Sequence, residues 1–284
     1  MGGGNHFLEV VYDDTPAQQV WCLLHSGSRH VGNTTALHYD RLARTWLMEQ
    51  QQQSSSSLSH SETTTSIRQF HGIHYMPMDS QAGQDYLTDM EWCQKYAHAN
   101  RQAMQTIMLQ IMEKVTGKQA EWDRAVNIHH NYCQCETCGN QKLWITRKGA
   151  TSAQKDEWGI IPGSMGSYSY ITRGKGQALS WNSSSHGAGR TMSRTRAKQS
   201  ISQNAFERSM DGVVCDTHEA VRDEAPQAYK DLDMVMTQQA SLTEIVYKLK
   251  PLINVKGFET TKSQRKNGSK NKQKSKDKKK RGRK

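Results

Sequence analysis

Long hydrophobic runs are missing from this sequence. Nowhere in its 284 residues do about eighteen apolar residues follow one another, which is the length that a membrane-spanning helix needs. Met1 is followed by glycines instead of a charged segment and an apolar stretch, which argues against a secretory signal peptide. We therefore expect a soluble intracellular protein, cytoplasmic or nuclear, with no membrane partner.

The cysteines do not indicate a disulfide framework. The chain has six cysteines and no secretory signal, so reduced thiols or metal ligands are the better interpretation. Three of them, Cys133, Cys135 and Cys138, form a C-x-C-x-x-C cluster soon after His129. This spacing suits a structural zinc ion whose fourth ligand is His129 or a residue elsewhere. A loop of free thiols is an equal alternative.

The excess of positive charge is confined to one end. The formal net charge is +11, but Thr261 to Lys284 hold thirteen Lys and Arg against one Asp, so the remaining residues sum to about −1. This tail has no apolar residues to bury, and we expect residues 259–284 to be disordered. The tail could contact phosphates without sequence preference, or it could be a nuclear localisation signal. The third alternative is a solvated tail that only increases solubility.

Periodicity predicts an α+β fold with long functional loops, in a single domain that spans residues 1–258. The stretch of about residues 50–66 is rich in Gln, Ser and Thr and indicates a flexible insertion. The apolar stripe of residues 84–115 indicates a long amphipathic helix whose methionines belong to the core. We expect strands at 7–12, 19–25, 125–128, 143–146, 160–161 and 252–255, and helices at 37–50, 84–115 and 242–249.

Histidines stand where predicted strands meet loops. Asn5 and His6 follow three glycines at the mouth of the first strand, His25 ends the second, and His129 and His130 follow a third. Three histidines at strand ends suit a divalent metal ion. A single histidine in such a position, however, more often has a structural role.

Two segments rich in Gly and Ser, residues 162–170 and 182–194, are typical of anion-binding loops. The second contains His186, beside Arg190 and Arg194. A histidine in such a loop can attack a phosphorus atom and hold it as a phosphoramidate. From spacing alone, a polar turn around a buried histidine accounts for the segment slightly better.

Taken together, these segments resemble the signature of the RtcB family of RNA-splicing ligases. The resemblance implies an enzyme that uses GTP and Mn²⁺ to join RNA 3′-phosphate or 2′,3′-cyclic phosphate ends to 5′-hydroxyl ends. It further implies a histidine–GMP intermediate and a role in tRNA splicing or RNA repair. The matching blocks occur in the family's order: Gly2–Glu9, His25–Arg29, His130–Tyr132, Arg147–Ala150, Pro162–Gly166, Ser185–Arg190, Ala228–Asp231 and Val255–Gly257.

The resemblance also implies roles for single residues. His186 is the catalytic nucleophile, and His6, His25 and His130 are metal ligands, with His130 preferred to His129 because it directly precedes Asn131. Glu9 accepts hydrogen bonds from guanine, which selects GTP over ATP, and Tyr229 stacks on the base. The positions that match nucleotide contacts are Asn5, His6, Phe7, Leu8, Glu9, His130, Asn131, Pro162, Gly163, Ser164, Met165, Ser169, His186, Gly187, Ala188, Gly189, Tyr229 and Lys256.

Members of the family carry an Asp and a metal-bridging Cys ahead of the block in which this chain starts. We therefore expect the N-terminal portion of the domain to lie outside this chain, with weaker metal binding as the result. The alternatives are a fragment, a split ligase whose other half is a separate chain, and a catalytically impaired RNA-binding protein. Accessory proteins are possible partners. Motif chemistry without the resemblance would suggest a metal-dependent hydrolase.

Overall fold

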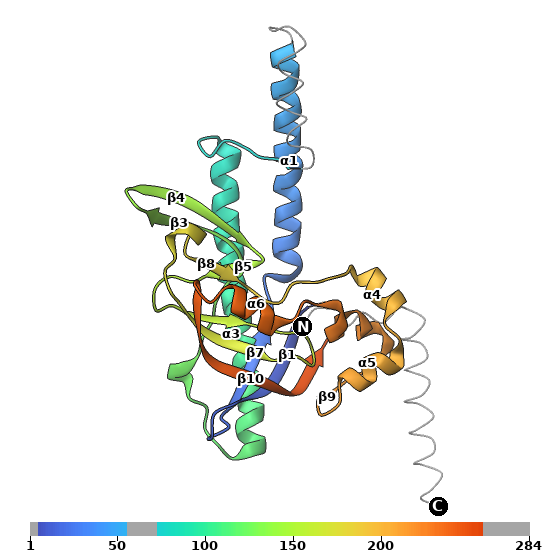
Figure 1. Ribbon diagram of the computed structural model, residues 1–284. Coiled ribbons are helices and arrows are strands. Elements are labelled where there is room, and N and C mark those ends of the chain that lie inside the picture. Colours follow the sequence, from blue (N-terminus) through green and yellow to red (C-terminus); the bar gives the residue numbers. More distant parts are fainter. Residues whose placement is uncertain (1–4, 56–72, 258–284) are drawn as a thin grey trace, which may run out of the picture.

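The computed structural model describes residues 5–55 and 73–257. Its centre is a six-stranded sheet in the order β2-β1-β10-β7-β6, with β9 paired to β10 outside that path (Figure 1). The α+β class is confirmed, and the first and last described strands lie side by side. The sheet strands are β1 (Phe7–Asp13), β2 (Val20–His25), β6 (Trp158–Ile161), β7 (Ser169–Gly174), β9 (Val214–Cys215) and β10 (Thr243–Lys256).

Alternation along the strands gives the sheet two apolar faces. One face buries Val11, Leu23 and Leu249 in a cluster that includes Phe7 and Ile171. The opposite face packs Ile161 and Tyr170 against Leu232 and Met236 of α6 (Leu232–Gln238). In Figure 1, α6 lies in front of the sheet, and α3 (Gln81–Thr116) passes behind it.

A pair of long helices packs beside the sheet and buries only a few side chains. The helices α1 (Arg29–Ser55) and α3 lie side by side, and the Tyr39 hydroxyl donates to Asp89 at 2.7 Å (Figure 1). The predicted helix at 84–115 is confirmed, and α1 is longer than the predicted 37–50 at both ends. None of the described helices is long and apolar enough to cross a membrane.

The low-complexity insertion was predicted to be flexible from about residue 50, and this is wrong for residues 50–55, which continue α1. Helix formation there follows from the Gln-rich sequence, because Gln loses little side-chain freedom in a helix. Residues 56–66 of that insertion and the tail 259–284 lie outside the described residues.

The apolar stripe of α3 is buried only in its first half. Cys93 and Ala97 are buried, whereas Ile107, Ile111 and Val115 are 59%, 57% and 76% exposed. The stripe therefore belongs to the core only in its first half, and Met104 and Met108, which were predicted to be core residues, are half-buried because no described element covers the second half.

Two local predictions fail, one near the C-terminal end and one at residues 125–128. The predicted helix 242–249 and strand 252–255 form one strand, β10, which lies between β1 and β7. Pairing on both edges overrides the local helical pattern. Pro251 is tolerated inside β10 because it pairs with Val11, where the register with β1 shifts.

Residues 125–128 were predicted to be a strand, but they form an irregular segment. Their polar groups are held by side chains instead of a neighbouring strand, since Arg101 donates to Asn127 at 2.7 Å. His130 therefore precedes a strand, β3 (Asn131–Cys138), and does not follow one.

The remaining elements form a hairpin, a short ladder and a helical lobe. Phe206 is the centre of the lobe's own apolar cluster, with Met165, Ala197 and Val221 around it. The elements are the hairpin β3–β4 (Gln141–Lys148), the ladder β5 (Ala150–Ser152) and β8 (Ser183–Ser185), the lobe α4 (Arg194–Ser200), α5 (Gln203–Ser209), η3 (Glu219–Glu224) and η4 (Pro226–Ala228), and the short turns η1 (Trp122–Arg124) and η2 (Ala178–Ser180).

Changing Phe206 to Ala tests the lobe as an integral part of the fold. Phe206 is fully buried, so we expect the free energy of unfolding to fall by about 3–5 kcal/mol in urea denaturation. The control is Leu179→Ala, because Leu179 is 93% exposed and its loss should change stability by less than about 0.5 kcal/mol. Equal losses in the two variants would contradict the placement of Phe206.

Candidate active site

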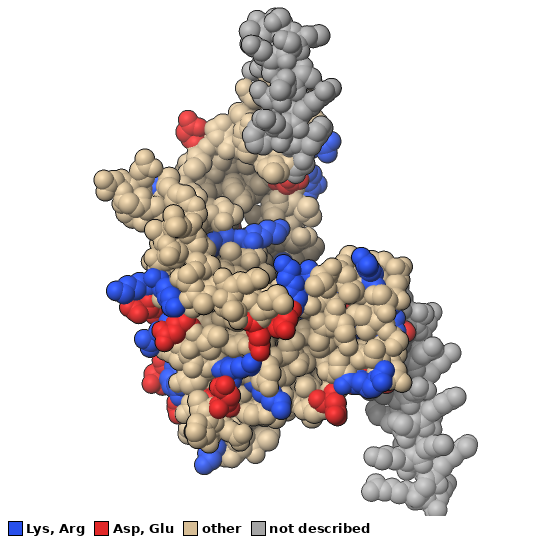
Figure 2. All heavy atoms as spheres, in the orientation of Figure 1, with Lys and Arg blue, Asp and Glu red and all other residues tan. Residues whose placement is uncertain are grey.

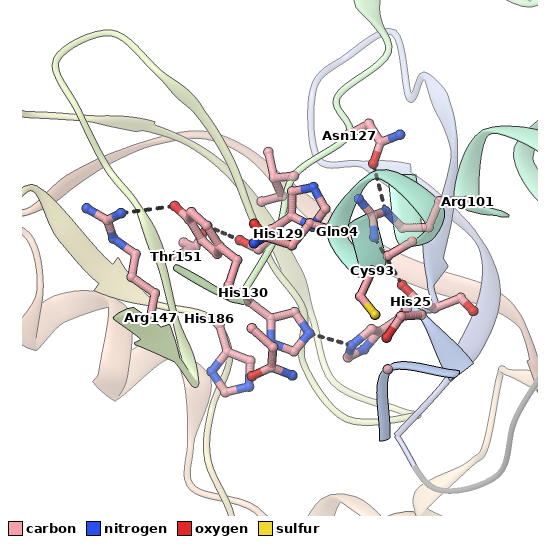
Figure 3. Close-up of a pocket in the computed structure, with 18 of the residues that line it drawn as sticks. His25, Cys93, Gln94, Arg101, Asn127, His129, His130, Arg147, Thr151 and His186 are labelled. Carbon is pink, nitrogen blue, oxygen red and sulfur yellow. Dashed lines mark hydrogen bonds between the residues drawn. The ribbon is translucent and has the colours of Figure 1, made fainter. Parts of the chain in front are cut away.

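Two cavities meet at a shared wall in the middle of the molecule. The smaller encloses about 270 Å³ between the sheet and the helical lobe, and the larger about 480 Å³ between β2, α3 and β3. Phe7, His25, Pro162 and His186 line both cavities. Figure 3 shows the larger one, with His186, His130 and His25 following one another across it.

The smaller cavity collects most of the predicted nucleotide-binding residues from segments far apart in the sequence. Gly163 belongs to its lining loop, and a side chain there would collide with the Tyr168 carbonyl oxygen, so the loop can be this tight only with glycine. The predicted residues that line the cavity are Asn5, Phe7, Glu9, Pro162, Gly163, Ser164, Met165, His186, Gly187, Ala188, Gly189, Tyr229 and Lys256.

Several other predicted nucleotide-binding residues lie outside that lining. The Leu8 side chain points to the opposite face of the sheet, as alternation along β1 requires. Ser169 is buried beneath the loop, where its hydroxyl accepts from the Gly163 amide at 3.1 Å. His130 and Asn131 line the larger cavity. His6 contacts Arg29 at 3.0 Å through Nε2.

A buried carboxyl group forms the floor of the smaller cavity. Glu9 is 4% exposed and accepts a hydrogen bond from Asn254 of β10, its partner in the β1–β10 register. Burial raises the pKa of Glu9 to about 8, even though the Asn254 donor and the Lys256 charge oppose this shift. With this pKa the carboxyl is mostly protonated at pH 7, and a ligand that donates hydrogen bonds to it would favour the carboxylate, which only accepts.

A second carboxyl group organises the cations on the opposite wall. Glu224 accepts from Lys256 at 3.0 Å and from the Tyr229 hydroxyl at 2.7 Å, and it also pairs with Arg194. Burial raises its pKa, but Lys256, Tyr229 and Arg194 together hold the pKa of Glu224 below the ordinary value. The guanidinium of Arg190 lies 4.8 Å from the centre of the Tyr229 ring. Each of the three cations on this wall, Arg190, Arg194 and Lys256, thus has Glu224 as a partner.

One hydrogen bond fixes the tautomer of His186. Its Nδ1 lies 2.6 Å from the Gly149 carbonyl oxygen, which can only accept, so Nδ1 carries a proton. In the neutral imidazole the lone pair is therefore on Nε2. Gly149 has a φ of 72°, in the left-handed region, which favours glycine at this position. The tautomer required of a nucleophilic histidine is set by the backbone.

Three further imidazoles lie close to His186. His130 stacks on it at 4.7 Å between ring centres, and His25 Nε2 lies 2.8 Å from His130 Nε2. The His6 ring is 5.6 Å from that of His25. Burial, reinforced by neighbouring imidazoles, lowers the pKa of His25 to about 3 and that of His130 to about 4. Both are neutral at pH 7, which leaves lone pairs for a metal ion.

As they stand, the described residues do not complete a metal site. No group of three or more His, Cys, Asp or Glu side chains in 5–55 and 73–257 is arranged to hold an ion. His25 Nε2 and His130 Nε2 are 2.8 Å apart, which is a hydrogen-bond distance, so one of the two nitrogens carries a proton that a metal ion would displace. The imidazoles supply neutral ligands, and the anionic ligands are missing from this group.

The cysteine cluster lies on β3. Successive side chains of a strand point to opposite faces, so Cys133 and Cys135 share one face and Cys138 belongs to the other. All three thiols are free. Zinc binding there stays a prediction, and it would require a different local backbone to bring the three sulfur atoms together.

Comparison with known proteins identifies the family. The family model described as tRNA-splicing ligase RtcB matches residues 1–257. The chain belongs to the RtcB family. It is similar to the RNA-splicing ligase RtcB of Escherichia coli K12, with 38% identity over 262 residues, and to the tRNA-splicing ligase RtcB of Nanoarchaeum equitans, with 33% over 298 residues. These matches cover 90% of this chain but only 60% and 59% of the relatives, so the chain spans about three fifths of their length.

The RtcB domain also places three residues in the site that the sequence did not reveal as part of it. Asn254 and Glu224 line the smaller cavity and hold Glu9 and Lys256, while Arg101 lines the larger one. A sign of Arg101 was available, because it follows Cys93 and Ala97 at four-residue spacing on the buried face of a helix. For Asn254 the available signal was a polar side chain among the apolar residues Leu252, Ile253 and Val255.

Changing Glu9 to Gln tests the buried carboxyl of this RtcB domain. The folded pKa of about 8 lies above the ordinary 4.5, so the folded protein binds more protons between these values and loses stability as the pH rises through them. Gln has no proton to lose. In urea unfolding, the stability of Glu9→Gln relative to the wild type should therefore increase steadily from pH 5 to pH 8. A difference that is independent of pH would contradict the buried ionisable Glu9.

Proposed function

We propose that this chain carries the nucleotide pocket and the nucleophile of a GTP-dependent RNA ligase. The ligase joins RNA 3′-phosphate or 2′,3′-cyclic phosphate ends to 5′-hydroxyl ends, in tRNA splicing or RNA repair. The observation that carries this proposal is the free Nε2 lone pair of His186, which the Gly149 carbonyl fixes on a wall shared by two cavities. One cavity can then hold the nucleotide and the other the RNA end.

GTP fits the smaller cavity by its chemistry. The acceptor oxygens of Glu9 suit the N1 hydrogen and the exocyclic amine of guanine, and adenine lacks both donors at this edge. The glycines of residues 187 and 189 line the cavity beside His186, where backbone amides can approach phosphate oxygens. Tyr229 offers its ring to the base, with Lys256 close to it on the same wall.

The reaction then has three displacements at phosphorus. His186 Nε2 bonds to the α-phosphorus of GTP, and the bond to the β-phosphate oxygen breaks to release pyrophosphate. An oxygen of the RNA 3′-phosphate next bonds to that phosphorus as the bond to Nε2 breaks. Finally, the RNA 5′-hydroxyl oxygen attacks the 3′-phosphorus, loses its proton, and displaces GMP. GTP is needed because a 3′-phosphate is a poor electrophile until one of its oxygens belongs to a good leaving group.

Manganese is expected to bind next to these groups. His6, His25 and His130 would hold it through neutral nitrogens, and the bound metal would stabilise negative charge on the phosphates. Among the described residues that line the larger cavity there is no Asp or Glu. We propose that the anionic ligands come from the part of an RtcB chain that this sequence does not span, whether in the same polypeptide or in a separate one. Accessory proteins are further candidate partners.

Covalent labelling tests the nucleophile. The full chain, joined to the portion of the E. coli relative that it does not span, should form a labelled adduct from GTP carrying the label in its α-phosphate, in Mn²⁺ and on a denaturing gel. The variant His186→Ala should form none, because its Nε2 is gone. The control is His38→Ala on the exposed surface of α1, which should label like the wild type. A joined protein without a labelled band would contradict the proposal.

Changing Glu9 to Gln also tests the choice of nucleotide. Gln replaces one acceptor oxygen by a donor, which opposes the two donors of guanine but suits the acceptor and donor of adenine. We expect a preference for GTP over ATP of at least about 100-fold in the wild type and its loss in Glu9→Gln, measured by equilibrium binding. Glu244→Gln, on the exposed part of β10, is the matched control. An unchanged preference in Glu9→Gln would place guanine elsewhere.

A further inference from the structure

The larger cavity is positively charged and contains no acidic side chain among the described residues that line it. Its wall includes His25, His129, His130 and His186, together with Arg101 and Lys148. A third cation, Arg147, is already neutralised by its buried pairing with Glu136. Figure 2 shows a hollow in the surface between the β3–β4 hairpin and α1, with Lys or Arg side chains at its lower edge. A cavity of this composition favours an anion.

Arg101 is the most unusual group in that cavity. It is 8% exposed, and its Nε donates to Asn127 Oδ1 at 2.7 Å while Nη1 makes a long contact of 3.4 Å with the Ser26 carbonyl oxygen. Nη2 is buried and has no hydrogen-bond partner among the described residues. No described carboxylate pairs with this guanidinium. A buried charge without a counter-charge is costly, so this arrangement is explained if a ligand completes it.

One more observation points to a ligand at this place. His130 Nδ1, on the same cavity, is a second buried polar atom without a partner among the described residues. Figure 3 shows Arg101 reaching from α3 toward Asn127, with His25 below it.

The position of the cavity indicates which anion. His186 lies on the wall between the two cavities, so a nucleotide in the smaller one leaves the larger one for the group that accepts GMP. In the proposed ligation that acceptor is the 3′-phosphate of an RNA strand. A volume of about 480 Å³ holds a phosphate with its nucleoside, whereas a protein carboxylate would fill only a corner of it.

We propose that Arg101 is the anchor of the RNA 3′-terminal phosphate, with the larger cavity as the seat of the terminal nucleotide. The assignment rests on the proposed ligase function, because that function supplies the phosphate. Arg101 binds the phosphate through Nη2 and leaves its Nε on Asn127, so that residues 126–130 are ordered around the substrate. It is a binding residue and takes no part in the chemical steps.

Binding of two matched RNAs tests the anchor. The probes are one short RNA with a 3′-phosphate and the same RNA with a 3′-hydroxyl, measured by fluorescence anisotropy with the full chain. A charge-assisted hydrogen bond predicts about 10- to 100-fold tighter binding of the 3′-phosphate RNA. Arg101→Met should abolish this preference without changing the affinity for the 3′-hydroxyl RNA, and Arg101→Lys should keep part of it. Arg208→Met, at an exposed position of α5, should bind like the wild type.

Thermal unfolding provides a readout that does not depend on RNA. Inorganic phosphate should raise the melting temperature of the wild type and of Arg208→Met, but not that of Arg101→Met. Without phosphate, Arg101→Met should melt at or above the wild-type temperature, because it removes an unpaired buried charge. This result also shows that the variant folds.

Two outcomes would overturn the assignment. The assignment is wrong if Arg101→Met keeps the preference for the 3′-phosphate RNA, or if the wild type shows no preference. In either case the partner of Arg101 would be a carboxylate of another protein segment. GTP binding is measured on the same proteins and separates the two hypotheses. Loss of GTP binding with an intact, Arg101-dependent phosphate preference would remove the proposed ligase function and leave the anion site standing.

Discussion

The pairing of β1 with β10 is the constraint on which the rest of the site depends. It joins the beginning and the end of the described chain, with Phe7 opposite Lys256 and Glu9 opposite Asn254. The Glu9–Asn254 bond and the Lys256–Glu224 ion pair are both buried, so each would be costly to leave half made. A slip of one residue would turn Glu9 to the opposite face of the sheet and remove the floor of the smaller cavity.

The two cavities differ in charge, and this difference gives each a role. In the smaller one, Arg190, Arg194 and Lys256 are each paired with Glu224 or Asp223, so a guanine base meets paired charges and the carboxyl group of Glu9. In the larger one, no described acid faces Arg101. His186 stands between them with its lone pair fixed by Gly149. The asymmetry suits a nucleophile that takes a phosphoryl group from one side and passes it to the other.

Local patterns predicted those parts of the fold whose partners lie close in sequence. The strands β1 and β2 and the helix α3 were found because periodicity is strong where one face is buried. The strand β10 was missed at residues 242–249 because its pairing with β1 and β7 is not visible locally. The stripe on α3 shows the opposite error, since Ile107, Ile111 and Val115 carry the pattern of a buried face without a described element to cover them.

The motif residues of the candidate site were predictable from the sequence. The residues that hydrogen-bond to them or pair with their charges were not. The resemblance named Glu9, Tyr229 and His186, all of which line the smaller cavity. It did not name Asn254, Glu224 or Arg101, which hold or complement those groups through contacts between distant segments. Nor could it give the His186 tautomer, because that depends on a carbonyl oxygen thirty-seven positions away.

The most direct test of this account is a crystal structure of the full chain soaked with GMP. The account predicts the guanine edge within hydrogen-bond distance of the Glu9 carboxylate and the phosphate next to His186 Nε2, with His186 Nδ1 still on the Gly149 carbonyl. A nucleotide bound in the larger cavity, or a guanine edge turned away from Glu9, would contradict it.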